Sequence, residues 1–344
     1  MKKFWKNKKV LITGCSGFTG SWLIIWLRLY GANISGYSLK KDNNYIFNYL
    51  KLHKNINFYE GNILNKNRLK KFIKSNEPDI IFHLAAEPIV IDCFKDPIRA
   101  FSVNTLGTLN LLQILKDLNI KKRFQLNIIT TDKVYKNTNK KKKFTENDNL
   151  GGDDPYSASK ACAEIISRSY YESYLKDKLS MNTFRAGNII GGGDWSNFRL
   201  IPDIFISIYK KKKLIIRNPK HIRPWQHIFD VINAYLKISQ KTFGKNNFEN
   251  WNIGPSQKKM FNVIEILKII NGFFEAQINY KVNKHNNFEK KYLTLETKKI
   301  RKLNIKNKLD INKSLILTAE WYKNFFTKKD KLFSERQLKQ YLKI

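Results

Sequence analysis

Short apolar runs alternate with segments of helical periodicity over most of the first half of this chain. The apolar runs predict six strands, at residues 10–12, 33–37, 56–59, 80–84, 124–130 and 183–185. The longer patterns predict helices at residues 21–30 and 157–176, and two more that flank the fifth strand. Strands that alternate with helices form parallel sheets, so we expect an α/β fold with a doubly wound parallel sheet.

The pattern changes near residue 187, where glycine- and proline-containing loops replace the regular alternation. Such loops with interspersed helices are typical of a smaller lobe that closes over a ligand. We therefore expect a sheet domain over residues 1–186. Residues 187–344 are expected to form mainly a smaller, mixed, substrate-binding lobe, with some of the chain returning to the sheet domain.

The composition predicts a folded protein of high positive charge. Hydrophobic residues make up 42% of the 344 positions, which excludes a disordered chain. A net charge of +36 leaves a nonenzymatic nucleic-acid or polyanion binder as a distant alternative, since clustered cations release counterions from phosphates. Only 11 of the 64 cations are Arg, and the lysines are scattered. We therefore expect no nucleic-acid partner and a surface that favours anionic ligands.

The cysteines and the start of the chain bear on location. Cys15, Cys93 and Cys162 show neither paired spacing nor a metal-ligand pattern, so we expect no disulfide, no metal and a reducing compartment. The apolar run after the N-terminal lysines is too short for an export signal. Arg28 interrupts the longest apolar stretch, which argues against a membrane span. We therefore expect a cytoplasmic protein without membrane attachment.

A glycine-rich turn follows the first predicted strand. Residues 13–20 read Thr-Gly-Cys-Ser-Gly-Phe-Thr-Gly, a G-x-x-G-x-x-G pattern that opens the first predicted helix. Glycines permit the tight turn and a close backbone approach, while the helix N-terminus binds a pyrophosphate. The order of strand, glycines and helix therefore predicts a Rossmann-type dinucleotide site at Gly14, Gly17, Phe18, Thr19 and Gly20.

The end of the second predicted strand leaves the choice of dinucleotide open. An acidic residue there holds the ribose of NAD, whereas a cation suits the 2′-phosphate of NADP. Here the strand ends in Ser38-Leu39-Lys40-Lys41-Asp42, and Lys40 stands near the usual position of the acid. We favour NAD, with NADP as the alternative.

A Y-x-x-x-K pattern, Tyr156 and Lys160, lies on the helix predicted after the fifth strand. A spacing of four places both side chains on one helix face, so we expect the Lys160 ammonium to lower the pKa of the Tyr156 phenol. A tyrosinate is a general base for an alcohol that transfers hydride to a nicotinamide. Thr131, Asp132 and Lys133 follow the fifth strand, at the sheet edge where ligands bind in such folds.

Motifs along almost the whole chain resemble those of the extended short-chain dehydrogenases/reductases. The early motifs, which include residues 83–88, 103–108, 131–133 and 154–160, are shared by many nucleotide-sugar epimerases and dehydratases. Residues 199–203, 216–219 and 223–227 are similar to the CDP-glucose branch of the 4,6-dehydratases. A dehydratase or epimerase for another nucleotide sugar is the alternative.

The resemblance implies an NAD-dependent dehydration of CDP-glucose to CDP-4-dehydro-6-deoxyglucose, for the synthesis of deoxysugars such as those of the lipopolysaccharide O-antigen. It assigns proton acceptance from the C4 hydroxyl to Tyr156, with Thr131 holding the C4 oxygen. It also makes Asp132 the acid at C6 and Lys133 the base at C5. A lysine acts as a base only if burial or nearby charge lowers its pKa.

The resemblance also implies the binding residues. The cofactor would be held by the glycine turn and Tyr156 and Lys160, together with Asn62, Ile63, Leu84, Ala85, Ala86 and Asn104. The nucleotide sugar would be held by Asn188, Arg199, Arg217, Arg223 and Tyr292. The chain departs from the family pattern at Glu87, often Gln, and at Asn62, usually Asp.

A homodimer or homotetramer is implied as well. In extended reductases the helix with the Y-x-x-x-K pattern packs against a neighbouring subunit. Ile165, Ile166 and Tyr170 are the apolar residues that we expect in this contact.

Overall fold

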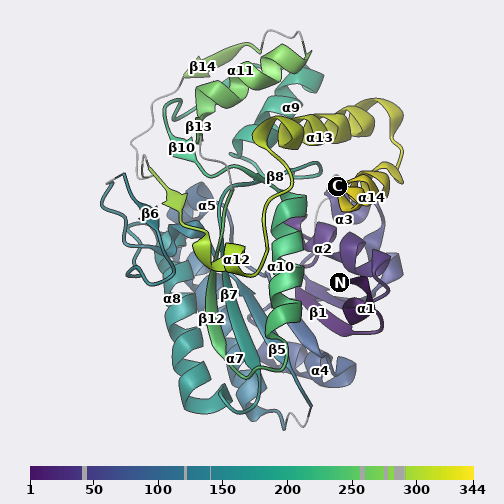
Figure 1. Cartoon of the computed structure of the whole chain (residues 1–344), viewed down its shortest axis with the longest axis vertical. Coiled ribbons are helices and arrows are strands. Elements are labelled where there is room, and N and C mark those ends of the chain that lie inside the picture. The colour runs from purple at the N-terminus through teal and green to yellow at the C-terminus, as the bar shows by residue number, and fades with distance from the viewer. Residues whose placement is uncertain are drawn as a thin grey trace.

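The computed structural model describes residues 1–40, 45–119, 122–139, 141–255, 260–274, 278–282, 290 and 292–344. Its centre is a seven-stranded sheet of order β12-β7-β5-β4-β1-β2-β3, and all its neighbouring strands pair in parallel. The strands are β1 (Lys9–Thr13), β2 (Asn33–Ser38), β3 (Asn57–Glu60), β4 (Ile80–His83), β5 (Gln125–Ile129), β7 (Ser180–Ala186) and β12 (Phe248–Ile253). The predicted doubly wound α/β fold is therefore confirmed (Figure 1).

Helices cover both faces of this sheet and continue into the second half of the chain. In the first half they are α1 (Lys2–Trp5), α2 (Phe18–Leu29), α3 (Ile46–Tyr49), α4 (Lys66–Asn76), α5 (Val90–Lys95), α6 (Pro97–Phe101), α7 (Gly107–Asp117) and α8 (Pro155–Tyr170). In the second half they are α9 (Leu200–Lys210), α10 (Ile228–Thr242), α11 (Val263–Phe274), α12 (Lys298–Lys302), α13 (Ile311–Lys323) and α14 (Phe333–Lys343). Short 3₁₀ or π turns are η1 (Leu52–Asn55), η2 (Ser102–Leu106), η3 (Asp132–Val134), η4 (Tyr171–Leu175) and η5 (Asn324–Lys328).

Alternate residues of the central strands face two separate cores. Val10 and Ile12 of β1 pack in a core with residues of α2 and α10, whereas Leu11 packs in a second core with residues of α4 and α7. Successive side chains of a strand point to opposite faces, and both faces here are covered. The central strands are for this reason apolar at consecutive positions, which is why they were recognisable as short unbroken runs.

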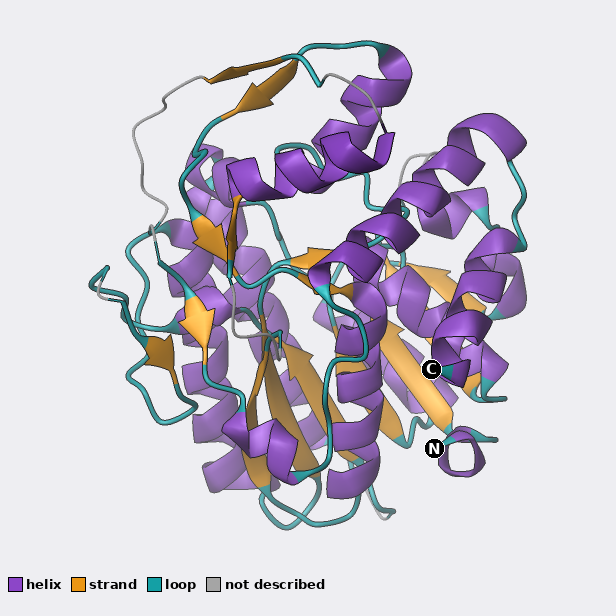
Figure 2. Ribbon diagram, turned by 45° about the horizontal axis from the view of Figure 1, so that its top comes forward, coloured by secondary structure: helices purple, strands orange, loops and turns teal. Residues whose placement is uncertain are grey.

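The second half of the chain supplies both a small lobe and a seventh strand. Four small two-stranded pairs join distant segments: β6 (Lys143–Phe144) with β15 (Thr294–Leu295), β8 (Ile189–Ile190) with β11 (Gln226–His227), β9 (Leu214–Ile216) with β14 (Tyr280–Val282), and β10 (Ile222–Arg223) with β13 (Phe261–Asn262). Helices α9, α11 and α13 lie at one end of the sheet, while α10 runs along it (Figures 1 and 2). Strand β12, which the sequence pattern did not predict, pairs with β7 at the sheet edge.

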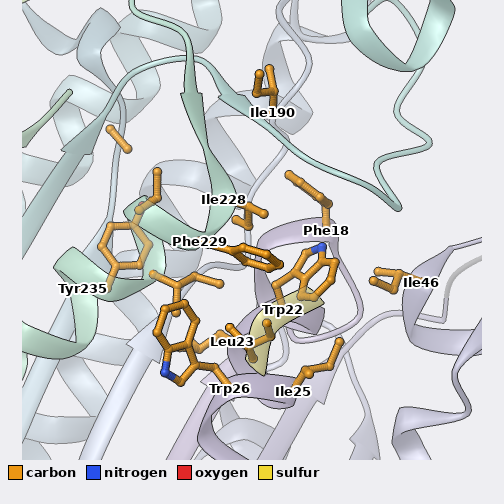
Figure 3. Close-up of a cluster of buried hydrophobic side chains, with 14 of the residues drawn as sticks. Phe18, Trp22, Leu23, Ile25, Trp26, Ile46, Ile190, Ile228, Phe229 and Tyr235 are labelled. Carbon is orange, nitrogen blue, oxygen red and sulfur yellow. The ribbon is translucent and has the colours of Figure 1, made fainter. Parts of the chain in front are cut away.

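Aromatic packing joins this lobe to the first helix. Trp22 of α2 contacts Phe229 of α10 with ring centroids 4.9 Å apart, and Figure 3 shows both rings in the buried cluster. The Trp22 indole donates a hydrogen bond to the Gly192 carbonyl, 2.9 Å away. A Cβ at Gly192 would lie 2.0 Å from the Trp321 side chain, so only glycine allows this approach. The packing fixes the loop after β8 over the start of α2.

Candidate active site

A cavity of about 830 Å³ lies where the carboxyl ends of the central strands meet the small lobe. The turns after β1, β2, β4 and β5 line its sheet side, and α8 contributes Tyr156 and Lys160. The lobe side is lined by the loop after β7, the start of α9, and residues 215–218. Ligands of open α/β sheets bind at this edge.

The glycine turn after β1 brings the start of α2 to the cavity. Gly14 has φ +69°, and a Cβ there would lie 2.6 Å from the Ala85 backbone nitrogen. A Cβ at Gly20 would lie 2.6 Å from the Gly14 carbonyl oxygen. Gly17 caps α2 without a side chain, and no acidic residue stands in the first turn of that helix. The helix therefore presents backbone N–H groups and its positive end to the cavity, which suits a phosphate.

All five predicted residues of this turn line the cavity, as do five of the six more distant cofactor candidates. These are Asn62, Ile63, Leu84, Ala85 and Ala86. Asn104 is buried and lies outside the lining. Its side-chain oxygen accepts from the Glu87 N–H at 2.9 Å, and its amide donates to the Ser159 hydroxyl at 2.9 Å. Asn104 therefore holds the loop after β4 against α8 from behind the site.

Strand β2 ends in Ser38 and has no acidic residue at the position that holds the ribose of NAD in many dinucleotide sites. The hydroxyls of Ser38 and Ser16 are 2.7 Å apart, and Ser16 also donates to the Leu39 carbonyl at 2.9 Å. Ser38 and Leu39 line the cavity, whereas Lys40 is exposed and is not among the described lining residues. Asp42 lies outside the described residues.

The predicted catalytic residues meet at the end of β5. Thr131, Asp132, Lys133, Tyr156 and Lys160 all line the cavity. The Thr131 hydroxyl caps the η3 turn by accepting from the Lys133 N–H at 3.3 Å, and it also hydrogen-bonds with the Tyr156 phenol. Asp132 and Lys133 are adjacent on the 3₁₀ turn η3. The turn therefore places a carboxyl group and an amine in the lining of the cavity that also contains Tyr156.

The pKa of Tyr156 differs from the expectation. Burial raises this pKa to about 12, although the hydrogen bond with Thr131 and the charge of Arg199 lower it. The expected net lowering of this pKa is wrong for this structure, because the effect of burial exceeds that of the hydrogen bond and the charge that lower it. The Lys160 ammonium donates to the Ile129 carbonyl at 3.1 Å. Burial also lowers the pKa of Lys160 to about 8, which Cys93 and Glu164 partly oppose.

Asp132 has the environment of a proton donor. Its side chain is 2% exposed, and its Oδ2 has no hydrogen-bond partner in the described part of the chain. Burial raises the pKa of Asp132 to about 6, although the charges of Lys133 and Arg223 and a hydrogen bond from Thr131 lower it. A carboxyl with such a pKa exchanges its proton near neutrality, which is what general acid catalysis requires.

We expect Asp132→Asn to stabilise the protein above pH 6. Because folding raises the pKa of Asp132, the stabilisation by its protonated form is present at low pH and is lost as the pH rises through about 6. The free energy of unfolding of the wild type should fall by at most about 3 kcal/mol over this pH range, at 1.36 kcal/mol for each unit by which folding raises the pKa. Thermal melting of both proteins between pH 4 and pH 8 measures this effect, because the change falls between the pKa of the unfolded chain and that of the folded protein.

Asp148 provides the control for that experiment. A hydrogen bond from Lys142 lowers the pKa of Asp148, so Asp148→Asn should gain no stability as the pH rises. Equal pH dependence of melting in wild type and Asp132→Asn would show that Asp132 is ionised without penalty.

The lobe brings cationic side chains to the cavity. Asn188, Arg199, Arg217 and Arg223 line it, as predicted for nucleotide binding. Arg199 pairs with Asp194 at 3.1 Å, and Arg217 donates to the Phe198 carbonyl. Arg223 is 5% exposed and donates to the Lys290 carbonyl at 2.9 Å. These arginines are held in place by the protein, as bidentate recognition of a phosphate requires.

Tyr292 is the predicted substrate residue that the structure does not bring into the lining. Its carbonyl accepts from the Asn137 side chain at 2.8 Å, and its backbone bridges to Ile222. It therefore connects the segment after β14 to β10, beside the buried Arg223.

Asp203 lines the cavity and was missed as a site residue. It stands on the first turn of α9, and burial raises its pKa to about 6, while Arg217 lowers and Asp194 raises it. Asp203 stands four residues after Arg199, within the motif at residues 199–203. The sequence analysis selected only the arginine of that motif as a site residue. Among the described residues, no group of three or more His, Cys, Asp or Glu could hold a metal ion.

Comparisons with known proteins show what this chain is similar to. The family model described as GDP-mannose 4,6 dehydratase matches residues 11–315. The CDP-glucose 4,6-dehydratase of Salmonella typhimurium is 34% identical, over 99% of this chain and 98% of its own length. The dTDP-D-glucose 4,6-dehydratase of Dictyostelium discoideum is 34% identical over 68% of this chain and 56% of its own length.

Solved structures show the same fold. The dTDP-glucose 4,6-dehydratase of Bacillus anthracis, in complex with NAD, has a TM-score of 0.77 and 24% identity, with 92% of this chain and 96% of that chain covered. The UDP-glucose 4-epimerase of Thermotoga maritima, with UDP-glucose, has a TM-score of 0.79 and 20% identity over 92% of this chain and 99% of that chain.

No helix in the described ranges has the length and apolarity needed to cross a membrane.

Proposed function

The chain belongs to the GDP-mannose 4,6 dehydratase family, and from this we propose that it dehydrates CDP-glucose to CDP-4-dehydro-6-deoxyglucose, a precursor of deoxysugars. The full-length similarity to a CDP-glucose 4,6-dehydratase supports this substrate. The observation that carries the proposal is the meeting of Asp132 and Lys133 with Tyr156 in one cavity. An acid, an amine and a phenol are the groups that oxidation at C4 and elimination across C5 and C6 need.

The residues of the cavity fit NAD. The glycine turn and the uncapped start of α2 would hold its diphosphate, and Asn62 and Ile63 line the wall next to them. The Oδ2 of Asp132, which lines the cavity and has no hydrogen-bond partner in the described chain, supports a polar ligand at this wall. When bound, NAD would take the C4 hydride, return it to C6, and favour the ionised form of a nearby phenol.

Tyr156 and Thr131 act on the C4 hydroxyl. Tyr156 accepts the hydroxyl proton as the C–H bond at C4 breaks, and the ketone forms. Thr131 hydrogen-bonds with Tyr156 and holds the C4 oxygen against the phenol. Lys160 fixes this part of α8 to Ile129 and places positive charge behind the phenol.

Asp132 and Lys133 then remove water from C5 and C6. The C4 ketone makes the C5 hydrogen acidic, and Lys133 accepts that proton. Asp132 donates its proton to the C6 hydroxyl, which leaves as water. When the hydride returns to C6, Lys133 gives a proton back to C5, which completes the 4-dehydro-6-deoxy sugar. The two groups are adjacent in sequence, so the η3 turn that Thr131 caps sets their separation.

Mass spectrometry of the reaction tests the proposal. Purified protein with CDP-glucose and NAD should release a product lighter by one water, whereas dTDP-glucose and GDP-mannose should react much more slowly. Turnover with NADP but not with NAD would assign a 2′-phosphate contact to Lys40. Equal turnover of all three sugars, or of none, would contradict the assignment to CDP-glucose.

The oligomeric part of the proposal concerns the outer surface of α6, η2 and α8. Ile98 is 80% exposed, Leu106 50% and Ile165 55%, and α6 and η2 both pack against α8. Ile166 and Tyr170 are instead half-buried against the chain's own core. Exposed apolar side chains on adjacent helices suit a contact with a second copy of the chain.

The three cysteines of the protein are free thiols, which supports the cytoplasm as its compartment.

We expect a dimer or larger assembly by light scattering at micromolar concentration, and Ile165→Glu should shift the population towards monomers. Leu332→Glu is the control, because Leu332 is 67% exposed next to α14, away from this surface. A wild-type monomer, or equal effects of both substitutions, would refute the assignment of this interface.

A further inference from the structure

Helix α8 carries a third polar residue in line with the two that the site uses. Tyr156, Lys160 and Glu164 follow one another at a spacing of four, so they lie on one face of the helix. Each contacts a consecutive part of the chain at the end of β5. Tyr156 hydrogen-bonds with Thr131, and Lys160 donates to the Ile129 carbonyl at 3.1 Å. Glu164 accepts from the Thr130 hydroxyl at 2.6 Å.

Thr130 is the last residue before the catalytic turn. Its N–H donates to the Phe184 carbonyl at 3.0 Å, and its hydroxyl approaches that carbonyl at 3.2 Å while donating to Glu164. The chain leaves Thr130 directly into Thr131, which caps η3. A displacement of Thr130 would therefore move Thr131 and Asp132 together.

Arg185 of β7 fixes the Glu164 carboxylate. Its Nε lies 2.9 Å from Glu164 Oε2, and both side chains are 2% exposed. Its Nη1 donates to the Tyr135 hydroxyl at 2.9 Å and to the Glu146 carbonyl at 3.0 Å. Each nitrogen of the Arg185 guanidinium thus donates at least one hydrogen bond, and Glu164 Oε1 accepts from both Arg185 and Thr130.

Glu164 stands one helical turn after Lys160 on α8, and its negative charge raises the pKa of Lys160. Cys93 and His83 also interact electrostatically with Lys160, and Tyr156 stands one turn before it on α8. Burial raises the pKa of Cys93 to about 11 and that of Tyr156 to about 12, and it lowers the pKa of His83 to about 3. Near neutral pH these three groups are uncharged.

We propose that Glu164 is a positioning residue of the active site, which anchors the Thr131–Asp132 turn to α8 through Thr130 and keeps Lys160 in its charged form. This inference rests on the proposed function. It assigns to Glu164 and Arg185 a role beyond the stability that a buried ion pair can provide, which is small or even unfavourable relative to apolar packing.

Three substitutions separate the two roles. Glu164→Gln keeps an acceptor for Thr130 but removes the charge. Glu164→Asp keeps the charge but shortens the side chain, and Arg185→Lys keeps both charges while breaking the bidentate contact. The readouts are the pH profile of nicotinamide reduction by CDP-glucose in a single turnover, and competitive acetylation of Lys160 against pH, which needs no ligand.

Glu164→Gln should lower the pH at which Lys160 loses its proton by about one pH unit in both readouts, because a nearby anion is gone. Arg185→Lys should keep the wild-type midpoint. Glu164→Asp should also keep it, but reduce the maximal rate between about 10-fold and 10²-fold, because Thr131 is displaced. Should Glu164→Gln fail to fold, the double substitution Glu164→Gln/Arg185→Gln leaves no buried unpaired charge. Because it also removes the Arg185 cation, its midpoint should be lowered by less than that of Glu164→Gln.

An unchanged acetylation midpoint in the Gln variants, or equal shifts in Glu164→Gln and Arg185→Lys, would overturn the inference and leave the pair a structural one. Wild-type protein that shows no nicotinamide reduction with CDP-glucose would contradict the proposed function instead. The acetylation profile would then still decide whether Glu164 controls the charge of Lys160.

Discussion

Tyr156→Phe should lower both nicotinamide reduction and overall turnover of CDP-glucose by about 10²- to 10⁴-fold, the range expected when a general base is removed. The phenol is buried, lines the cavity and hydrogen-bonds with Thr131, so its loss removes the acceptor for the C4 hydroxyl proton. Stopped-flow absorbance of the reduced nicotinamide measures the first step directly, and product release measures the whole cycle.

Tyr170→Phe on the same helix is the control. The Tyr170 hydroxyl donates to Gln113 of α7 at 3.0 Å, at the opposite end of α8 from Tyr156, so its loss should cost about 1 kcal/mol of stability and leave the rates near wild type. Rates for Tyr156→Phe within threefold of wild type would remove Tyr156 from the proton transfer at C4.

Lys133→Met should separate oxidation from elimination. Tyr156, Thr131 and Lys160 stay in place, so the enzyme should still reduce bound NAD with CDP-glucose. Without the amine at C5, release of the 4-keto-6-deoxy product should fall by about 10²- to 10⁴-fold, and exchange of the C5 hydrogen with solvent deuterium should nearly vanish. The exchange is the decisive signal because it reports the base at C5.

Lys136→Met controls for the loss of a cation from the same segment, since Lys136 is exposed and is not among the described residues that line the cavity. It should keep both exchange and turnover. If Lys133→Met also keeps them, the base lies elsewhere in the cavity, and the similarity of Asp132 and Lys133 to the CDP-glucose branch loses its chemical meaning.

Local sequence patterns were sufficient for six of the seven strands of the sheet, for the glycine turn and for the shared helix face of Tyr156 and Lys160. Strands β1 and β4 are buried on both faces and therefore stand out as apolar runs between helical segments. The spacing of the glycines after β1 follows from the tight turn and the helix start that they form. Both features involve only residues that are close along the chain. The spacing of Tyr156 and Lys160 predicts a shared helix face for the same reason. In each case the residues that interact are close along the chain.

The features that the sequence patterns missed depend on partners that are distant along the chain. Strand β12 exists because it pairs with β7 across the sheet edge, although its own residues show no strong strand pattern. The pKa of Tyr156 is set by burial, and a helix-face argument from Lys160 alone could not anticipate that.

Only the tertiary structure decided which groups act together in the site. Glu164 lies 21 residues from Arg185 and 34 residues from Thr130, yet all three meet behind the catalytic turn. The pKa of Asp203 is raised by burial and by the charge of Asp194, while Arg217 opposes this shift. Burial and charge depend on everything that surrounds a group in space. The sequence by itself therefore determined the fold class and the chemical groups, and the tertiary packing determined their protonation and their positions.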